Sequence, residues 1–562
     1  MTKMRIENFT WEHFMTMQLP KSIQDNLRFL TVEVNSQLAN LQSFFSTPSV
    51  ERGRRILDRS GYAYNLKIRI HRSCLNQLAT CKEASPETLS LRGVEFIATS
   101  LERIAELCRD CIKQMSYLND MNSLEVESYK PMLERIRHGI ELVEPAIQEN
   151  DSRLALKIGE IEAKLDRNYK KLHKHYIAAL KHKDNTEDLT CALFVAHSIE
   201  QMGDALLDIS ESILSANLGQ PVNFERYHSL QASVKHLDAD EDLSEVQIEA
   251  IAETRSGSAI SGITAADRKG DEYVAIFKDG EKRKLKEERK GVNSWHEIYP
   301  GLAPRILSYK KRGQSAALLI EHLPGLTFEQ VLLNESPKLL HETLNQLSRT
   351  LRSIWRETYT DKPVSANFMQ QMERRLVDVY KIHPEFQKGS SLICGQLIPP
   401  FDSLVKQAHN YEAGLQAPFS VYIHGDFNVD NIIYDPMEQR INFIDLHRSR
   451  YMDYVQDISV FMVSNYRLQI LDAPLRRRIM KLAKDFYRIA RRYADKMGDE
   501  TFELRLALGL ARSFATSTRF ILDKSLARSM FLRARYLIEQ VLAADPKKPA
   551  EFKIPVKEIF VG

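Results

Sequence analysis

The chain has 562 residues, of which 43% are hydrophobic and 27% are charged, and its formal net charge is +3. This length exceeds what one hydrophobic core usually supports, so two to four domains are expected. The near balance of charge gives no general case for nucleic-acid binding, and no apolar run approaches the ~18 residues of a membrane span. Six sparse cysteines, and an N-terminal segment without a signal-peptide pattern, favour a reducing cytoplasm.

Residues 20–217 carry apolar side chains at three- and four-residue steps, which predicts helix throughout. Breaks rich in Ser, Thr, Asp and Asn supply helix N-caps and divide the region into about six helices. The motif "CRDC" (108–111) lies within one helix, with no second CxxC and no nearby His. Its pattern favours two packed helix residues over a metal or redox pair.

Two of these helices resemble each other, because "LERIAEL" and "IEQMGDA" align at an offset of 98 residues (Glu102 against Glu200). Such a repeat suggests two three-helix bundles in tandem. Glu102 and Glu106 share one helix face, as do Glu200 and Asp204. The paired acids repel each other, and a divalent cation would relieve that repulsion. A solvated helix face is the alternative interpretation.

The whole of residues 20–217 resembles a PhoU-type domain, a family of two three-helix bundles that each carry a metal-binding E/DxxxD motif. "SIEQMGD" (198–204) matches that motif, whereas "SLERIAE" (100–106) has Glu106 where Asp is usual. The resemblance implies a regulatory role linked to phosphate transport and signalling. It also implies a phosphate-signalling protein partner and a divalent-metal site built from Glu102, Glu106, Glu200 and Asp204.

The pattern changes near residue 245, after which alternating strands appear. We predict five segments: a helical domain at 1–217, a linker at 218–248, a small strand-rich lobe at 249–325, a larger helical lobe at 326–545, and a tail at 546–562, expected to be extended. The small lobe holds one predicted helix, at 284–299. The larger lobe holds paired strands at 420–446.

Those paired strands flank "IHGDFNVDN" (423–431), a turn with many polar side chains. Asp426 lies on the turn, where a carboxylate can reach a substrate hydroxyl. Asn431 and Asp445 follow at neighbouring strand ends, and their oxygens suit Mg²⁺. Each residue alone also fits a turn or a helix cap. Together they indicate a phosphoryl-transfer site.

The small lobe supplies the remaining parts. Lys278 ends the strand "YVAIFK", where its ammonium can contact phosphates, and Glu288 is the acid expected to hold it, with Glu287 as the fallback. Gly257 and Gly262, in "TRSGSAISG" (254–262), allow close backbone approach to phosphates. This segment is not a GxGxxG loop.

Residues 246–540 resemble the aminoglycoside phosphotransferase and choline kinase family, whose fold is protein-kinase-like. The family's HGDxxxxN motif matches His424, Gly425, Asp426 and Asn431, and its metal-binding Asp matches Asp445. "LLIEHLPG" (318–325) matches the linker between lobes, where the backbone from Glu321 to Leu323 would meet adenine. Asp457, in "DYVQDISVF" (453–461), matches a structural residue.

The resemblance implies that ATP and Mg²⁺ are cofactors. Asp426 would orient or deprotonate the acceptor hydroxyl, while His424 braces the loop. Asn431 and Asp445 would hold Mg²⁺. Lys278 would bind the ATP phosphates, positioned by Glu288.

The predicted fold is therefore multidomain: an all-α PhoU-like pair of three-helix bundles and an α+β bilobal kinase-like domain. The predicted function is ATP-dependent transfer of phosphate to a hydroxyl of a small molecule, with a regulatory helical half. The alternative is a nucleotide-binding regulator without turnover. The basic segment 475–496 favours an anionic substrate or polyanion, although a solvated helix face also explains it. Nucleic-acid binding is disfavoured, and a homodimer is left open.

Overall fold

The computed structural model describes residues 19–80, 86–182, 185–218, 221–234, 247–253, 259–266, 272–312, 315–470 and 472–561. The chain divides into two compact units: Met1–Thr254 with Ala259–Tyr273, and Arg255–Ser258 with Val274–Gly562. Within the described ranges, no helix is long and apolar enough to cross a membrane.

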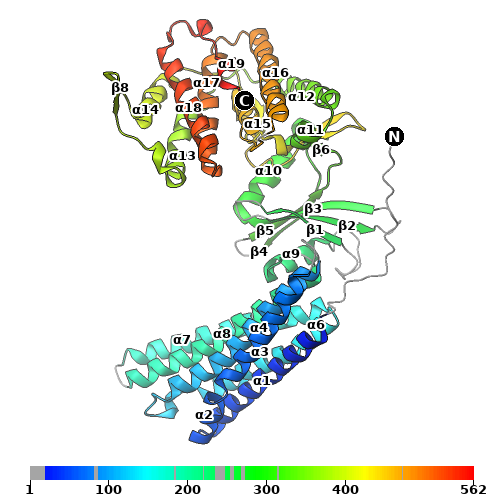
Figure 1. Cartoon of the computed structure of the whole chain (residues 1–562), viewed down its shortest axis with the longest axis vertical. Helices are drawn as coiled ribbons and strands as arrows, with labels where there is room; N and C mark the ends of the chain where they lie inside the picture. Colours follow the sequence, from blue (N-terminus) through cyan, green and yellow to red (C-terminus); the bar gives the residue numbers. More distant parts are fainter. Residues whose placement is uncertain are drawn as a thin grey trace. The chain divides into compact units, whose positions relative to one another are not determined.

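Long helices running alongside one another make up most of the first unit (Figure 1). The prediction of about six helices missed two breaks, at residues 58–59 and at Leu142. Side chains of Ser49 and Asp151 cap two of the helices by accepting backbone N–H bonds, as the sequence predicts. The helices are α1 (Lys21–Ser46), α2 (Val50–Leu57), α3 (Ser60–Leu78), α4 (Pro86–Met115), α5 (Val126–Glu141), α6 (Val143–Gln148), α7 (Ser152–Leu180), α8 (Thr186–Leu218) and α9 (Phe224–Val234). Strands β1 (Gln247–Glu253) and β2 (Ala259–Ala266) form an antiparallel hairpin.

The internal repeat places α4 and α8 against each other. Arg103 Nη2 donates to Gln201 Oε1 at 3.2 Å, so this bond joins residues separated by the repeat offset of 98. Gly203 permits close packing of α8 on α7, because a Cβ there would lie 2.8 Å from Leu165 Cδ1. The helical fold class predicted for this half is confirmed.

Cys108 and Cys111 are fully buried within α4. Burial raises the pKa of Cys108 to about 12 and raises the pKa of Cys111 well above its usual range. Both thiols therefore stay protonated, as packed core residues do. In the second unit, Cys394 is exposed.

A three-stranded antiparallel arrangement and one helix make up the small lobe of the second unit. The strands β3 (Glu272–Glu281), β5 (Ser315–Glu321) and β4 (Ile306–Arg312) lie in that order. Helix α10 (Lys282–Ile298) packs on β5 through Leu285, which meets Ala316, Leu318 and Ile320. The predicted helix at 284–299 and the predicted strands are therefore present.

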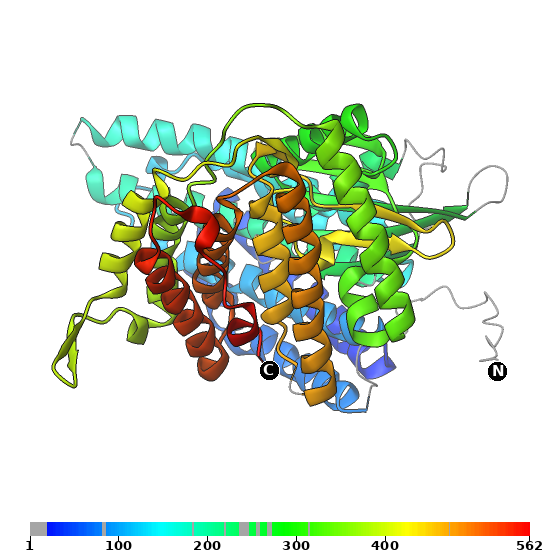
Figure 2. The same ribbon diagram turned by 90° about the horizontal axis from the view of Figure 1, so that it is seen from above.

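The large lobe of the second unit is mostly helical. Its helices α15 and α16, gold and orange in Figure 2, lie side by side. Buried Arg505 pairs with both Asp453 and Asp499, which ties α17 to its neighbours. The helices are α11 (Phe328–Asn334), α12 (Pro337–Glu357), α13 (Phe368–Ile382), α14 (Phe401–Glu412), α15 (Val455–Tyr466), α16 (Ala473–Met497), α17 (Phe502–Ser517), α18 (Lys524–Ala543) and α19 (Val556–Ile559).

The large lobe also contains short strands, which pair into small sheets. Strand β10 (Ile432–Asp435) pairs with β11 (Arg440–Phe443) and with β6 (Leu326–Thr327). Strand β9 (Val421–Ile423) pairs with β12 (Arg450–Met452), and β7 (Ser391–Ile393) pairs with β8 (Gln396–Ile398). The α+β class predicted for this half is confirmed.

The prediction that the tail (546–562) is extended was wrong for Val556–Ile559, which form helix α19. Phe560 is fully buried beside Tyr466 and Phe514. Burial of an aromatic side chain offsets the cost of ordering the tail.

Helix α10 is seated directly on the large lobe. A Cβ at Gly291 would lie 2.0 Å from the carbonyl oxygen of Leu446, so only glycine allows this approach. Trp295, one turn further on, packs edge-on against Tyr422 and Phe443. Its indole Nε1 donates to Ser449 Oγ at 2.8 Å. These contacts fix α10 relative to the loop that follows β11.

We expect Gly291→Ala to destabilise the second unit by about 1–3 kcal/mol, because α10 must move away from Leu446. Urea unfolding followed by tryptophan fluorescence measures this, since Trp295 and Trp355 both lie in this unit. Gly389→Ala is the matched control, because nothing lies within 4 Å of a Cβ there. Equal unfolding midpoints for the two variants would contradict the seating of α10.

We also expect iodoacetamide at about pH 8 to modify Cys394 in the folded protein while leaving Cys108 and Cys111 unmodified, because the reactive species is the thiolate. Mass mapping of peptides identifies the modified positions, and Cys394→Ser is the control that removes the exposed thiol. Rapid modification of Cys108 or Cys111 in folded protein would show that the "CRDC" motif is accessible.

Candidate active site

The turn after β9 has a conformation that requires glycine. Gly425 has a φ of +84°, and a Cβ there would lie 2.4 Å from the carbonyl oxygen of Arg448. The loop 424–426 therefore lies tightly against the segment between β11 and β12.

A single buried carboxylate anchors this turn. Asp457 accepts the backbone N–H groups of His424 and Gly425, each at 2.8 Å, with its two oxygens. Burial raises the pKa of Asp457 to about 7, although the two N–H donors act to lower it. Asp457 thus holds the turn from α15, in the position that the sequence resemblance assigned to a structural residue.

His424 is buried, and both of its ring nitrogens have partners. The Nε2 atom lies 2.9 Å from the carbonyl oxygen of Ile444, so it carries the proton, because a carbonyl only accepts. The Nδ1 atom then accepts the backbone N–H of Asp426 at 3.3 Å. Burial lowers the pKa of His424 and favours this neutral form. The His424 side chain therefore links the turn to Ile444, the residue that follows β11.

Asp426 presents its carboxylate next to two other side chains. Its Oδ1 accepts Asn428 Nδ2 at 3.0 Å, and its Oδ2 pairs with Arg448 Nη1 at 2.9 Å. The side chain of Asp426 is 21% exposed, so solutes can reach the carboxylate. Arg467 Nη2 contacts Asn428 Oδ1 at 3.3 Å and adds a second guanidinium nearby.

Asn431 and Asp445 are brought together by the pairing of β10 with β11. The backbone N–H of Ile444 donates to the carbonyl oxygen of Asn431 at 3.0 Å, immediately before Asp445. Asn431 Nδ2 donates to the carbonyl oxygen of Asp426 at 2.9 Å, which leaves Oδ1 as the amide atom outside that bond. The amide is therefore oriented with an oxygen available as a ligand.

Asp445 has a φ of +61°, a left-handed conformation uncommon for a residue other than glycine. Burial alone would raise the pKa of Asp445, but the bond from His447 Nδ1 at 3.1 Å and the charge of Lys278 hold it below its usual range. Asp445 is thus ionised, and non-glycine residues in this backbone region often mark functional sites.

Lys278 and Glu288 form a buried ion pair between β3 and α10. Burial would lower the pKa of Lys278, but the charges of Glu288 and Asp445 outweigh that effect and raise it. The ammonium therefore stays charged and interacts with carboxylates from both lobes. Glu287 is exposed, whereas Glu288 is buried and is the residue that contacts Lys278.

The linker after β5 lies at the junction with the large lobe. The Glu321 carboxylate forms an ion pair with the Arg305 side chain at 3.2 Å. The backbone N–H of Glu321 donates to the carbonyl oxygen of Arg305 at 2.9 Å. Leu323 is buried. Gly262 lies in β2, opposite Glu249, and Gly257 lies outside the described residues.

The acidic pairs of the helical unit differ from each other. Glu102 forms an ion pair with Lys67 at 2.9 Å, and Glu106 forms one with Arg103 at 3.4 Å. Basic side chains therefore neutralise both acids of this pair. Burial raises the pKa of Glu200 and of Asp204. Among the residues that the structure describes, no three His, Cys, Asp or Glu side chains meet as a metal site. Metal binding in this unit stays a prediction.

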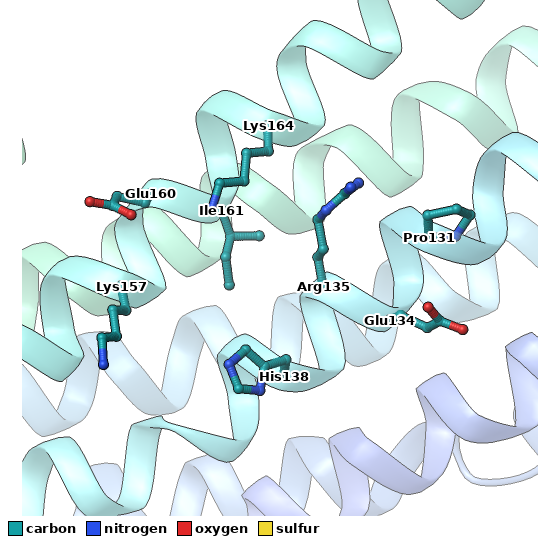
Figure 3. A pocket seen from close by; sticks show the side chains of 8 residues that line it. All are labelled: Pro131, Glu134, Arg135, His138, Lys157, Glu160, Ile161 and Lys164. Atoms are coloured by element: carbon teal, nitrogen blue, oxygen red, sulfur yellow. The ribbon is translucent and has the colours of Figure 1, made fainter.

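A surface groove of about 420 Å³ also lies in the helical unit, between α5 and α7 (Figure 3). Ile161 lies at its base, while its charged side chains are exposed and of both signs. We assign it no ligand. Its lining residues are Pro131, Glu134, Arg135, His138, Lys157, Glu160, Ile161 and Lys164.

Several basic residues beside Asp426 were not predicted from the sequence. They come from α13, α17, the loop after β11 and the turns after α15 and α17, so no short motif contains them. They are Arg375, Arg448, Arg467, Arg512 and Arg519.

Comparisons with known proteins agree with this organisation. Residues 272–493 match the model of the phosphotransferase enzyme family, and residues 130–213 match the model of the PhoU domain. No curated protein sequence matches the chain.

Each half of the chain is similar to solved structures. The phosphate transport system regulatory protein PhoU from Streptococcus pneumoniae is 17% identical over 36% of this chain and 96% of its own, with a TM-score of 0.34. An aminoglycoside-3'-phosphotransferase of type VIII is 15% identical over 50% of this chain and 97% of its own, with a TM-score of 0.34. An ethanolamine kinase from Plasmodium vivax is 11% identical over 59% of this chain and 92% of its own, with a TM-score of 0.32.

The two family matches confirm both resemblances noted in the sequence. The N-terminal region of this chain contains a PhoU domain, and its C-terminal half contains a domain of the phosphotransferase enzyme family.

Proposed function

We propose that the second unit transfers the γ-phosphoryl group of ATP to a hydroxyl of a small molecule. The observation that carries this proposal is the charge interaction that joins Lys278 to Asp445 across the two lobes, with Asp426 and Asn431 on the adjoining loop. A base, two metal ligands and a phosphate-binding lysine are the parts that phosphoryl transfer requires.

Asn431 and Asp445 would hold Mg²⁺. The donor set fits. Asp445 is ionised, and the Oδ1 atom of Asn431 takes no part in the hydrogen bond that its Nδ2 atom donates to Asp426. When bound, the ion would neutralise negative charge on the phosphates. His447 holds Asp445 in place through its hydrogen bond.

Lys278 would bind the α- and β-phosphates, and Glu288 would keep its ammonium aimed at them. The linker from Glu321 to Leu323 would offer backbone groups to adenine, by its likeness to the family's linker. That Gly257 and Gly262 allow close backbone approach to the phosphates stays a prediction from their glycine-rich sequence.

Asp426 would accept the proton of the acceptor hydroxyl, or orient that hydroxyl, as its oxygen attacks the phosphorus. The carboxylate is exposed enough to meet a solute and is held by Asn428. His424 would not transfer protons, because both of its nitrogens are committed to the backbone. Its role would be to keep Asp426 in position.

The PhoU domain would regulate this transfer or sense a ligand linked to phosphate. Glu200 and Asp204 would bind a divalent ion in that domain, while the pairing of Glu102 with Lys67 disfavours the same role in the first repeat.

We expect Asp426→Asn to remove phosphoryl transfer while leaving ATP binding nearly unchanged, because the side chain meets the acceptor and not the nucleotide. The measurement is ADP release with Mg²⁺-ATP and a pooled panel of hydroxylated metabolites, together with calorimetric binding of ATP. Asp361→Asn, at an exposed position, is the control.

Substrate-dependent ADP release that disappears in Asp426→Asn supports the proposal, and dividing the pool then identifies the acceptor. Equal activity in the variant contradicts the role of Asp426. ATP binding without any phosphorylated product would favour a nucleotide-binding regulator.

We expect Glu288→Gln to weaken ATP binding about tenfold or more, because a buried Lys278 loses its main counter-charge and turns toward Asp445. Glu287→Gln changes the exposed neighbour and should bind ATP like the parent protein. Calorimetric titration of both variants with Mg²⁺-ATP tests this. A similar affinity in both would show that the ion pair does not prepare the phosphate site.

A further inference from the structure

Three guanidinium groups from separate elements gather beside Asp426. Arg375 lies on α13, Arg512 lies on α17, and Arg519 lies on the 3₁₀ turn Thr518–Phe520 that follows α17. Arg375 interacts electrostatically with Arg519, Arg512 interacts with Arg375, and all three interact with Asp426. We call these three residues the arginine cluster.

None of the three guanidinium groups forms an ion pair with a carboxylate within the described part of the chain. Arg512 is only 4% exposed, and its Nε atom is buried without a hydrogen-bond partner. Burying a cation without a counter-charge is costly. Burial, followed by repulsion from neighbouring arginines, lowers the pKa of Arg512 to about 9 and that of Arg375 to about 10.

The acids whose charges act on the arginine cluster each have another partner. Asp426 pairs with Arg448 at 2.9 Å. Glu412 accepts the backbone N–H groups of Phe368 and Met369 at 2.6 and 2.8 Å. Asp378 pairs with Lys381 at 2.9 Å. The arginine cluster therefore carries an excess of positive charge.

The surrounding structure holds the arginine cluster in place. Arg512 Nη2 lies 3.4 Å from Ser459 Oγ, and its guanidinium carbon lies 5.6 Å from the centre of the Phe368 ring. The turn that carries Arg519 is tied to the end of α13, because the buried side chain of His383 lies 2.8 Å from the carbonyl oxygen of Ile521. Groups held before binding lose little conformational entropy when a ligand arrives.

A structural role for Arg512 alone is the simplest alternative. Its charge does act on Asp457, the carboxylate that anchors the turn. The two residues form no ion pair, however, and such a role would explain neither Arg375 nor Arg519.

We propose that the acceptor carries an anionic group, a phosphate or a carboxylate, that the arginine cluster binds so that the acceptor hydroxyl meets Asp426. Guanidinium groups suit both anions, because their planar donors match pairs of oxygens. A cationic amino alcohol would instead add charge to a site that already has an excess. This inference rests on the proposed function and specifies its substrate class.

The test uses four small alcohols of similar size that differ in charge: glycerol phosphate, glycerate, glycerol and aminopropanediol. Calorimetry measures their binding to the whole protein, with inorganic phosphate and sulfate as simple anions. Mg²⁺ and a non-hydrolysable ATP analogue are present at saturation, so that the phosphate site of the nucleotide is filled.

We expect at least one anion to bind, and we expect Arg375→Gln and Arg519→Gln each to weaken that binding about tenfold. Arg374→Gln is the matched control, since Arg374 is the exposed neighbour of Arg375 on the same helix. Preference for glycerol phosphate over glycerate, or the reverse, tells phosphate from carboxylate. Both arginine variants leave the buried Arg512 unchanged, because its replacement could prevent folding.

Three results would overturn the inference: no anion binds, glycerol or aminopropanediol binds as tightly as the anions, or Arg374→Gln weakens binding as much as Arg375→Gln. Failure of the proposed function has a different signature. In that case the ATP analogue does not bind, or Asp426→Asn transfers phosphate like the parent protein.

Discussion

The close approach of α10 to the loop after β11 is the contact on which the site depends. Gly291 lets the helix reach the carbonyl oxygen of Leu446, and Trp295 bonds to Ser449 on the same loop. Ser449 in turn donates to the carbonyl oxygen of His424 at 3.2 Å. One helix therefore sets the position of Glu288, and with it Lys278, relative to the loop that carries Asp426.

Charge in this unit is arranged in two adjoining regions of opposite character. On the proposed nucleotide side, the charge of Lys278 is balanced by those of Glu288 and Asp445. On the proposed acceptor side, no ion pair balances the charge of the arginine cluster, and Asp426 lies between the two regions. A phosphoryl group passing from one region to the other would thus move between Asp445, with its proposed metal, and the arginine cluster, whose positive charge would favour negative charge in the transition state.

The sequence predicted those parts of the fold and site that follow from local pattern. The order of strand, Lys278, helix and HGDxxxxN motif was sufficient to place the proposed catalytic residues and the fold class. The sequence also favoured Glu288 over Glu287, and the structure pairs Glu288 with Lys278. The arginine cluster could not be predicted, because Arg375 and Arg519 are far apart in sequence and meet only through packing of α13 against α17. The breaks at residues 58–59 and at Leu142 also lacked a clear signal.

The central claim is that Lys278, Asn431 and Asp445 hold Mg²⁺-ATP beside Asp426. The most direct measurement is a crystal structure of the whole protein with Mg²⁺ and a non-hydrolysable ATP analogue. The account predicts a metal ion about 2.0–2.1 Å from Asn431 Oδ1 and from a carboxylate oxygen of Asp445, with Lys278 Nζ on the phosphates and the γ-phosphate facing Asp426. A nucleotide bound elsewhere, or bound here with its γ-phosphate turned away from Asp426, would contradict it.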